Sequence, residues 1–593
     1  MKKRIDPITL EVIRNALCSI SDEMSAALIR TAYSTNIKDR RDCSCAVYLP
    51  SGEVVAQSEI ATPLHLGVMP AVVQTVLQRF PLSAMDPGDD IIMNEPYPAG
   101  PGHLNDITLV SPVFFKGKPV GLVANQAHHV DVGGYAPGSM PFGVTEIFQE
   151  GLQIPPVKIV KKNVIDEEIA SLIADNVRTK VEFRGDLLAQ VASNNVGERR
   201  FLELVAKYGR EDVLRYLREI MNHSERQMRE GIRKIPDGTY EFEDFIEGDS
   251  ISEDLIKIKV RVEVKGDEVL ADFTGSSPQV QGPLNCRKAS TAACVYYVLK
   301  CIVDPGIPPN SGAYRPIHVV APEGSVLDSQ YPHSTVHSNI ITTQRVVDAL
   351  LGAFLAAVPH RVMAAHHGTQ NLLNIGGTNP RTNRLFNYIE TYGGGQGAFH
   401  NQDGMDGIHS HMTNTRNAPV EVIEATYPLR VERYGLVPDS EGPGRCRGGM
   451  GMEREFTFLA PNLTITVSSD RNKIRPWGVL GGKAAANAKC LLLEDGSERA
   501  LPSKITRKVR EGARFRTVTS GGGGWGNPFE REPEHVRWDV LEGLVSFERA
   551  RTEYGVAIHP DTYEIDKEKT ARIRAKGAPT GGASGDGPRT CGV

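Results

Sequence analysis

The chain has 593 residues, of which 40% are hydrophobic and 23% are charged, a composition typical of folded globular proteins. At roughly 100 to 200 residues each, about two to four domains are expected. The 67 basic and 72 acidic residues are scattered along the chain and give a formal net charge of −5, so no basic stripe is available for phosphates or anionic lipids. We therefore expect neither nucleic acid nor a membrane as a partner.

The remaining composition favours a soluble, cytoplasmic protein. The charged N-terminus runs directly into an amphipathic pattern, which is not typical of a signal peptide. The Ala349–Val358 run is about ten apolar residues long, short of the roughly 20 that span a bilayer. The nine cysteines do not form the dense, even framework of a secreted scaffold. Cys43 and Cys45 lack the second pair that a zinc finger needs, and buried thiols explain them better.

The first region, residues 1–163, is predicted to be α+β. Asp6 and Pro7 are typical of a helix start, and apolar residues then recur at helical spacing to Leu28, which predicts an opening helix of about 25 residues. Two strand hairpins follow, the first pairing 45–49 with 54–57 and the second pairing 107–115 with 120–127 across a tight turn. This region is strand-rich.

The rest of the chain predicts a mixed α+β, multi-layer fold. The expected parts are a helical layer at 164–235, an α+β middle region at 236–375, a β-rich glycine-punctuated region at 376–530, one C-terminal helix within 531–560 and a disordered tail at 575–593. In the middle region we predict strands at 240–245, 258–264 and 269–273, and helices at 289–302 and 343–357.

The strongest chemical signal lies at the open end of the second hairpin. If its turn centres near Gly117, residues whose numbers sum to about 234 pair, which places Asp106 opposite His128 with Cβ atoms about 5 Å apart. His103 lies three residues earlier, in a glycine- and proline-rich loop that can bring its imidazole to the same point. A one-residue error in register would exchange His128 for His129, so both remain candidates.

Two imidazoles and one carboxylate suit a catalytic divalent metal, zinc, manganese or iron, because they leave coordination positions open for water or substrate. For any one of these residues alone, a strand-end cap or a turn hydrogen bond is the better interpretation. Their convergence favours the metal.

A second polar cluster lies within residues 393–414. His409 and His411 could share one strand face as metal ligands, but a substrate-binding loop or a satisfied polar network is equally consistent with the pattern. The glycine runs here and further on match neither a phosphate loop nor a dinucleotide fingerprint, and we interpret them as tight turns. Neither a nucleophile elbow nor a catalytic-cysteine signature is present, so covalent catalysis is not indicated.

Motifs along nearly the whole chain resemble those of the hydantoinase B, 5-oxoprolinase and acetone carboxylase α-subunit family. They occur in the same order as Asn36–Ala46, His65–Pro70, Asn94–Tyr97, His103–Asp106, His128–Gly134, Asp272–Gly275, Gly394–Gly397, Asn414–Glu421, Tyr434–Leu436, Arg447–Gly451 and Gly521–Pro528. Glu95 and Asn105 depart from the residues that are frequent in the family, aspartate and proline, without touching the proposed ligands.

The resemblance implies a set of site residues. It assigns His103, Asp106 and His128 as metal ligands, with Asp42 as an additional acidic ligand. His129 and Asp131, beside these ligands, are candidates for moving protons during catalysis. His65, Gln396, His409 and His411 are candidates for binding substrate.

The resemblance also implies a partner. Family subunits of this kind work with a larger hydantoinase A-type subunit, which has an actin-like fold, binds ATP and Mg²⁺ and would phosphorylate the oxygen of a cyclic amide. Water bound to the metal would then open the activated ring. The expected function is thus the metal-bearing subunit of an ATP-dependent amidohydrolase of EC 3.5.2 type, nearest to N-methylhydantoinase B-type subunits, in a hetero-oligomer.

Two alternatives remain. The chain could be the α-type subunit of an ATP-dependent ketone carboxylase acting on acetone- or acetophenone-like substrates, where the metal would stabilise an enolate. It could also be a structural or regulatory subunit that has lost its chemistry, although the intact His103, Asp106 and His128 set argues against this.

Overall fold

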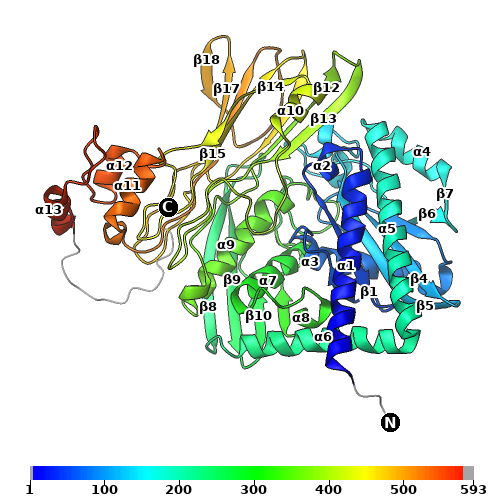
Figure 1. Ribbon diagram of the computed structural model, residues 1–593. Helices are drawn as coiled ribbons and strands as arrows, with labels where there is room; N and C mark the ends of the chain where they lie inside the picture. Colours follow the sequence, from blue (N-terminus) through cyan, green and yellow to red (C-terminus); the bar gives the residue numbers. More distant parts are fainter. Residues whose placement is uncertain (1–4, 578–593) are drawn as a thin grey trace.

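The computed structural model describes residues 5–577, which form helices and four β-sheets. Figure 1 shows a lower body that contains the N-terminal and middle regions, an upper lobe built from β12 to β18, and a group of short helices, α11 to α13, beside them. The predicted mixed, multi-layer arrangement of helices and strands is confirmed.

The opening helix and both hairpins are confirmed. Helix α1 spans Pro7–Thr31, and the Asp6 side chain caps it by accepting a hydrogen bond from Thr9 N. A seven-stranded sheet follows in the order β2-β1-β5-β4-β3-β6-β7. The elements of this region are α2 (Thr35–Lys38), β1 (Cys43–Tyr48), β2 (Val54–Gln57), α3 (His65–Arg79), β3 (Asp90–Met93), β4 (Asp106–Phe115), β5 (Lys118–His128), β6 (Val157–Lys161) and β7 (Val164–Ile165).

The predicted helical layer covers one face of this sheet. It consists of α4 (Glu167–Asp175), α5 (Lys180–Tyr208) and α6 (Arg210–Ile232). Helix α5 packs on β4 and β5, and α1 runs beside α5, as Figure 1 shows. Buried apolar residues of α1, β1, β5, α5 and α6 form one core between these elements.

On the opposite side of the N-terminal sheet, α3 contacts both β4 and the first helix of the middle region, Lys288–Val303. The middle region has its own four-stranded sheet, with the order β11-β10-β9-β8. Its elements are β8 (Gly238–Glu247), β9 (Leu255–Lys265), β10 (Glu268–Asp272), α7 (Lys288–Val303), α8 (Ser311–Tyr314), β11 (Ile317–Val320) and α9 (Thr343–Phe354), which ends three residues before its predicted end. The largest core contains both Val110 of β4 and Val347 of α9, so the two regions share one hydrophobic interior.

Two sheets form the upper lobe, with the orders β13-β12-β16-β19 and β14-β15-β20-β17-β18, and a separate core joins them. The elements are β12 (Leu372–Asn379), β13 (Arg384–Thr391), α10 (Val420–Thr426), β14 (Leu429–Leu436), β15 (Met452–Phe458), β16 (Leu463–Ser468), β17 (Lys489–Glu494), β18 (Ser497–Ala500), β19 (Lys504–Val509) and β20 (Arg514–Val518).

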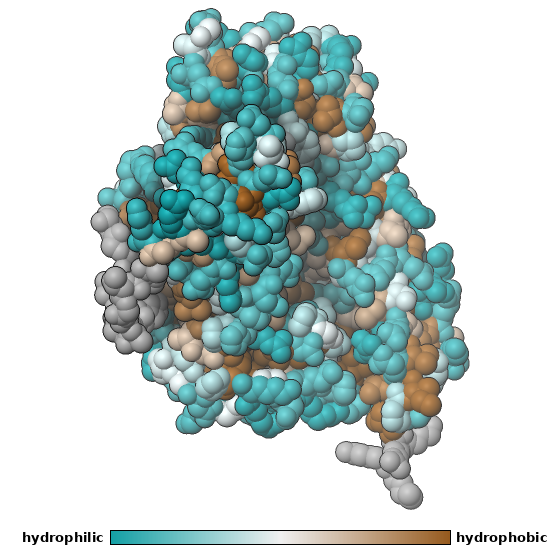
Figure 2. All heavy atoms as spheres, turned by 60° about the vertical axis from the view of Figure 1, so that its left-hand side comes forward, coloured by the Kyte–Doolittle hydropathy of each residue, from teal (hydrophilic) through white to brown (hydrophobic). Residues whose placement is uncertain are grey.

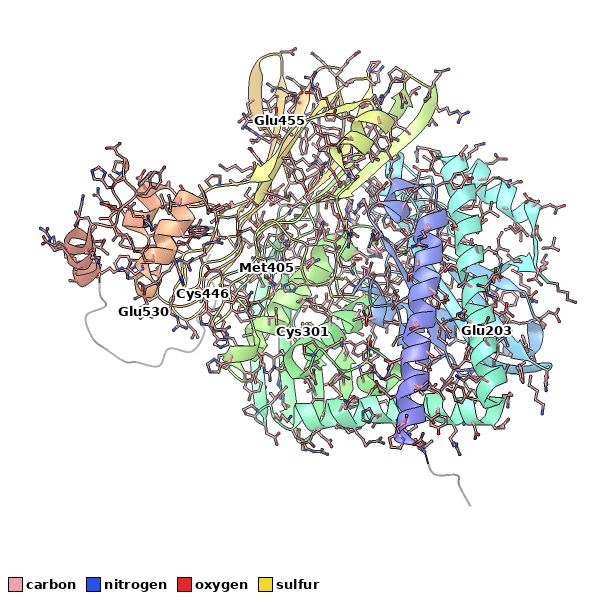
Figure 3. The ribbon with its side chains drawn as sticks, in the orientation of Figure 1. Glu203, Cys301, Met405, Cys446, Glu455 and Glu530 are labelled. Atoms are coloured by element: carbon pink, nitrogen blue, oxygen red, sulfur yellow. The ribbon has the colours of Figure 1, made fainter. Side chains whose placement is uncertain are left out.

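The glycine runs have a different cause from the one predicted. A Cβ added to Gly395 would lie 2.0 Å from the carbonyl oxygen of Gly449 and 2.2 Å from the nitrogen of Gly522, so three segments distant in sequence approach closely through their backbones. Figure 3 labels Met405 and Cys446 in this area, below the upper sheets. The interpretation as tight turns was wrong here, because close packing of backbones excludes side chains.

The C-terminal segment also differs from its prediction. Instead of one helix there are α11 (Pro533–Leu541) and α12 (Phe547–Thr552), separated by Gly543 with a φ of 70°, and then α13 (Lys567–Gly577). The predicted tail at 575–593 therefore begins inside α13, and its residues 578–593 lie outside the described part of the chain.

Within residues 5–577, no helix combines the length and the apolar character needed to cross a membrane. The face shown in Figure 2 is mostly hydrophilic, with apolar residues in small, separate groups.

Asp90, at the start of β3, predicts a pH-dependent stability. Burial raises the pKa of its carboxyl to about 7. The folded protein therefore holds a proton that the unfolded chain releases near pH 4, and stability falls as the pH rises from about 4 to 7. We expect Asp90→Asn to stabilise the protein, with a gain roughly 2 kcal/mol larger at pH 8 than at pH 5, measured by chemical unfolding.

The neighbouring Asp89 provides the control. Hydrogen bonds from Asp86 N and Lys158 outweigh burial and lower the pKa of Asp89. Asp89→Asn should therefore reduce stability at pH 8. The explanation fails if both variants respond to pH with the same sign.

Candidate metal centre

Three buried side chains converge where β4 begins and β5 ends. His103 Nε2 lies 3.2 Å from Asp106 Oδ2, and the rings of His103 and His128 meet edge to face with centroids 4.9 Å apart. One ligand atom from each residue lies within 4.8 Å of the other two. The residues are 2%, 2% and 6% exposed for His103, Asp106 and His128. At this proximity the three side chains could bind one metal ion from the same side.

The strand register produces this convergence. Asp106 pairs with His128, as predicted, and the only register shift of the hairpin lies further toward the turn, between Val113 and Phe114. The loop before β4 approaches the middle region closely, since a Cβ on Gly102 would lie 2.1 Å from Asn339 Oδ1. Asn339 in turn donates a 3.3 Å hydrogen bond to Asp106.

Hydrogen bonds orient the first imidazole. Nδ1 of His103 lies 3.0 Å from the carbonyl oxygen of Val336, which can only accept, so the ring proton belongs on Nδ1 and Nε2 is free to coordinate. His65 approaches the same carboxylate, with its Nε2 3.8 Å from Asp106 Oδ2, and its Nδ1 contacts Ser44 Oγ at 2.6 Å.

A second contact orients His128. The amide nitrogen of Asn36 lies 2.9 Å from Nδ1 of His128 and 2.7 Å from its carbonyl oxygen, and the amide oxygen accepts from the buried Arg40. Because an amide N–H donates, Nδ1 accepts here and the proton of the neutral ring lies on Nε2. Coordination through Nε2 therefore moves this proton to Nδ1, and Asn36 keeps only its bond to the carbonyl oxygen.

The pKa values of His103, Asp106 and His128 are shifted in different directions. Burial opposes charge on His103, but the Asp106 carboxylate raises the pKa of His103 to about 9. His103 in turn holds the pKa of Asp106 well below its usual range despite burial. Burial, and then the charge of His103, lowers the pKa of His128 to about 4. At neutral pH Asp106 is thus a carboxylate and His128 a neutral imidazole, whereas His103 carries a second ring proton on Nε2, which a bound metal ion would replace.

The three residues line a cavity of about 30 Å³, more than the roughly 10 to 15 Å³ that a buried water molecule needs. Asp42 and His65 line the same cavity, although Asp42 lies outside the group of three ligand atoms. The other lining residues are Arg40, Thr62, Leu64, Met140, Asn339, Ile340, Gln370, Leu372, Ile389, Thr391, Met412 and Thr413.

The structure does not bring His129 and Asp131 to this cavity. His129 points to the opposite face of the sheet, where its Nε2 lies 3.0 Å from Gln190 Oε1 of α5 and its ring packs on Phe183. Asp131 accepts hydrogen bonds from the backbone of Gly133 and Gly138 and pairs with Arg178. Their predicted part in proton transfer is at odds with this placement, because both side chains organise the fold instead.

Of the four predicted substrate-binding residues, only His65 lines the cavity. Gln396 accepts a hydrogen bond from Met405 N within the glycine-rich packing. His409 is half-buried, and shielding of its ring from water, together with the charge of Arg40, lowers its pKa to about 4. His411 joins a second group, with Asp348 and His366. Neither Asp348 nor His366 carried any local signal in the sequence.

Sequence reasoning also missed the supporting residues Asn36, Arg40 and Asn339. Asn339 lies in a π-helical turn, Ser338–Thr342, that precedes α9, and such turns gather at functional sites. The sequence pattern alone does not distinguish this turn from the α-helix that follows it.

The register of β4 and β5 predicts that two adjacent histidines, His128 and His129, differ in their effect on bound metal. We expect His128→Gln to lower the bound divalent metal by about one ion per chain, because a ligand is lost. His129→Gln, on the other face of the sheet, should retain it. Metal content is measured on the purified variants by mass spectrometry, and loss of metal from His129→Gln but not from His128→Gln would refute the proposed ligand set.

The Asn36 contact predicts a smaller effect of the opposite sign. Asn36→Ala should raise metal affinity, by up to about tenfold, because the lost amide N–H holds Nδ1 of His128 as an acceptor and so keeps the ring proton on the nitrogen that must coordinate. Thr35→Val in the same helix is the matched control, because Thr35 contacts Tyr427 instead of the centre. Competition with a chromophoric chelator measures both, and equal affinities would contradict the prediction.

Comparison with known proteins agrees with the motif pattern. Residues 6–528 match the family model described as hydantoinase B/oxoprolinase. The chain is 36% identical to the putative B-type component of a D-/L-hydantoinase from Pseudomonas sp. strain NS671, over 96% of this chain and 98% of that protein.

Two solved structures share the fold. The crystal structure of the ATP-dependent caprolactamase from Pseudomonas jessenii superposes with a TM-score of 0.90 at 30% identity, covering 97% of this chain and 100% of that one. A nucleotide-free acetone carboxylase structure gives a TM-score of 0.89 at 20% identity, over 96% and 83% of the two chains, and at this identity it shows the fold alone. The chain belongs to the hydantoinase B/oxoprolinase family.

Proposed function

We propose that this chain is the metal-bearing subunit of an ATP-dependent cyclic-amide hydrolase, of the kind that opens hydantoins, oxoproline-like rings or other lactams. The observation that carries the proposal is the buried His103, Asp106 and His128 group, which lines a cavity together with two further side chains that can bind metal or protons, Asp42 and His65. The names of its relatives include a hydantoinase component and a caprolactamase, which supports the substrate class.

The donor set fits a divalent transition metal. His103, Asp106 and His128 would hold it, with Asp42 as a further ligand, and zinc or manganese fits two imidazoles and carboxylates, with iron a third candidate. Such an ion supplies Lewis acidity and lowers the pKa of water. His65 is the residue of this chain best placed to hold a proton, because its Nε2 faces Asp106 at 3.8 Å inside the cavity.

The cavity wall suggests how the substrate is recognised. Leu64, Leu372 and Met412 provide apolar surface for the carbons of a ring. Arg40 is a fully buried cation on the same wall, and a phosphorylated amide carries the opposite charge. Because about 30 Å³ cannot contain a ring, substrate entry requires that these side chains move.

The nucleotide belongs on a second chain in this proposal. The glycine runs that could resemble phosphate loops are filled by neighbouring backbone, as at Gly395 and Gly449. We propose a hydantoinase A-type partner that binds ATP and Mg²⁺ and activates the amide oxygen.

The cysteines described in the structure are all unpaired, which fits the reducing cytoplasm.

A ketone carboxylase subunit is the second candidate, and one observation favours it. The fold matches an acetone carboxylase nearly as closely as it matches the caprolactamase. The same metal and buried Arg40 would then stabilise an enolate and hold a carboxylating species.

One assay separates the two functions. The chain is purified with its ATP-binding partner, and ADP release and substrate loss are followed with hydantoins, oxoproline, lactams and ketones, with and without bicarbonate. We expect ATP-dependent ring opening that needs no bicarbonate, and at least about a hundredfold loss of activity in His103→Ala. Consumption of a ketone only when bicarbonate is present would establish the carboxylase instead.

A further inference from the structure

A second group of potential metal ligands lies outside the cavity described above. It consists of Asp348 on α9, His366 in the segment before β12 and His411 in the loop after the glycine-rich run. His366 Nε2 and His411 Nε2 lie 4.0 Å and 3.8 Å from Asp348 Oδ1. All three residues are buried, and the two imidazole rings meet edge to face with centroids 4.0 Å apart.

The three converging atoms are unsatisfied. Asp348 Oδ1, His366 Nε2 and His411 Nε2 are buried and have no hydrogen-bond partner among the described residues. Buried polar atoms normally have a partner, and three orphans that face one point indicate a missing one. Separations of 3.8 and 4.0 Å are too long for direct hydrogen bonds but lie within several tenths of an ångström of the roughly 3.3 Å between ligands of a tetrahedral zinc ion.

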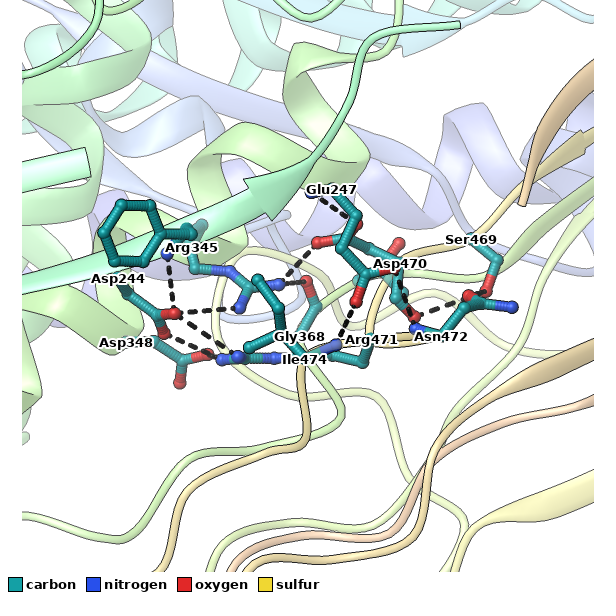
Figure 4. A network of polar contacts seen from close by, with 12 residues as sticks. Asp244, Glu247, Arg345, Asp348, Gly368, Ser469, Asp470, Arg471, Asn472 and Ile474 are labelled. Atoms are coloured by element: carbon teal, nitrogen blue, oxygen red, sulfur yellow. Dashed lines mark hydrogen bonds and ion pairs between the residues drawn. The ribbon is translucent and has the colours of Figure 1, made fainter. Parts of the chain in front are cut away.

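The surrounding charges leave Asp348 Oδ1 available. Oδ2 of Asp348 accepts a 2.9 Å hydrogen bond from Arg471, which also binds Asp244 at 2.8 Å. Arg345 pairs with Asp470 at 2.6 Å. Figure 4 shows Arg471 held between Asp244 and Asp348 in this network. Since the guanidinium groups are matched by carboxylates, the second oxygen of Asp348 remains for another cation.

His411 and His366 differ in how freely Nε2 can bind a metal, because their Nδ1 atoms have different partners. His411 adopts a left-handed backbone with a φ of 61°, which histidine tolerates better than most residues other than glycine, and its Nε2 lies 3.8 Å from Asp348 Oδ1. Tyr297 Oη lies 3.5 Å from its Nδ1. Nδ1 of His366 accepts a 2.8 Å hydrogen bond from Gly368 N, so a metal at Nε2 must shift the ring proton to Nδ1 and open that bond.

We propose that Asp348, His366 and His411 form a second site for a divalent transition metal, which fixes the wall of the first cavity. Met412 and Thr413 follow His411 directly and line that cavity, as does Gln370, four residues after His366. An ion at this site ties the two wall segments to α9. Two imidazoles and one carboxylate select zinc or a similar ion over magnesium or calcium.

Metal stoichiometry tests the proposal. Chain purified with zinc should contain two ions, the single variants His128→Gln and His411→Ala one each, and the double variant none. His409→Ala is the matched control, a half-buried imidazole two residues from His411 that lies outside the group, and it should contain two ions. A wild-type content of one ion that His411→Ala leaves unchanged would overturn the second site and leave the first intact.

A second readout does not depend on the stability of one variant. In the His128→Gln background, Co²⁺ should produce visible absorption from a nitrogen-ligated site, and zinc should raise the Tm of the folded chain. Both effects should disappear when either His411→Ala or Asp348→Asn is added. Absence of both effects in His128→Gln itself would contradict the proposal. Neither measurement uses enzyme activity, so the outcome is independent of the proposed hydrolase function.

Discussion

The antiparallel pairing of β4 with β5 is the interaction on which the site depends. Side chains alternate between the two faces of a strand, so a slip of one residue in this hairpin would send His128 toward α5 and bring His129 to the cavity. The observed register places Asp106 opposite His128 and leaves His129 to pack on Phe183. Burial of both faces makes the register costly to change, because each face has its own apolar core.

Local patterns were sufficient for those features that are local in sequence. The opening helix, both hairpins, the helical layer and the Asp106–His128 pair follow from periodicity, caps and turn residues. The proximity of His103 could also be predicted, because it lies only three positions before Asp106 in the sequence. The helix break at Gly543 was not found, since the apolar pattern continues past it to Val545.

Features that join distant segments were beyond such reasoning. The Asn36 contact with His128 spans 92 positions, and the Asn339 contact with Asp106 spans 233. The side chains of His129 and Asp131 were assigned to chemistry because they adjoin ligands, yet strand alternation and a backbone turn direct them elsewhere. The glycine runs bring together the backbones of Gly395, Gly449 and Gly522, which are far apart in the sequence, so no local pattern indicates their contact.

The two candidate metal groups differ in what surrounds them. The first has open space on one side and polar neighbours that orient its ligands, which suits exchange of water or substrate. The second is enclosed by ion pairs among Asp244, Asp348 and Arg471, where charges are matched and exchange with solvent is restricted. Under the two proposals, the first group would provide the reactivity and the second would support the wall of its cavity.

The shared core of the N-terminal and middle regions has a consequence for synthesis. Strands β1 to β5, which contribute to the shared core, are complete once residue 128 has left the ribosome, but α9, which belongs to the same core, follows more than two hundred positions later. At about 5 to 20 residues per second, an apolar surface stays without its partner for on the order of 10 to 40 s. A nascent chain of this topology is therefore a natural client of chaperones, whatever the stability of the finished protein.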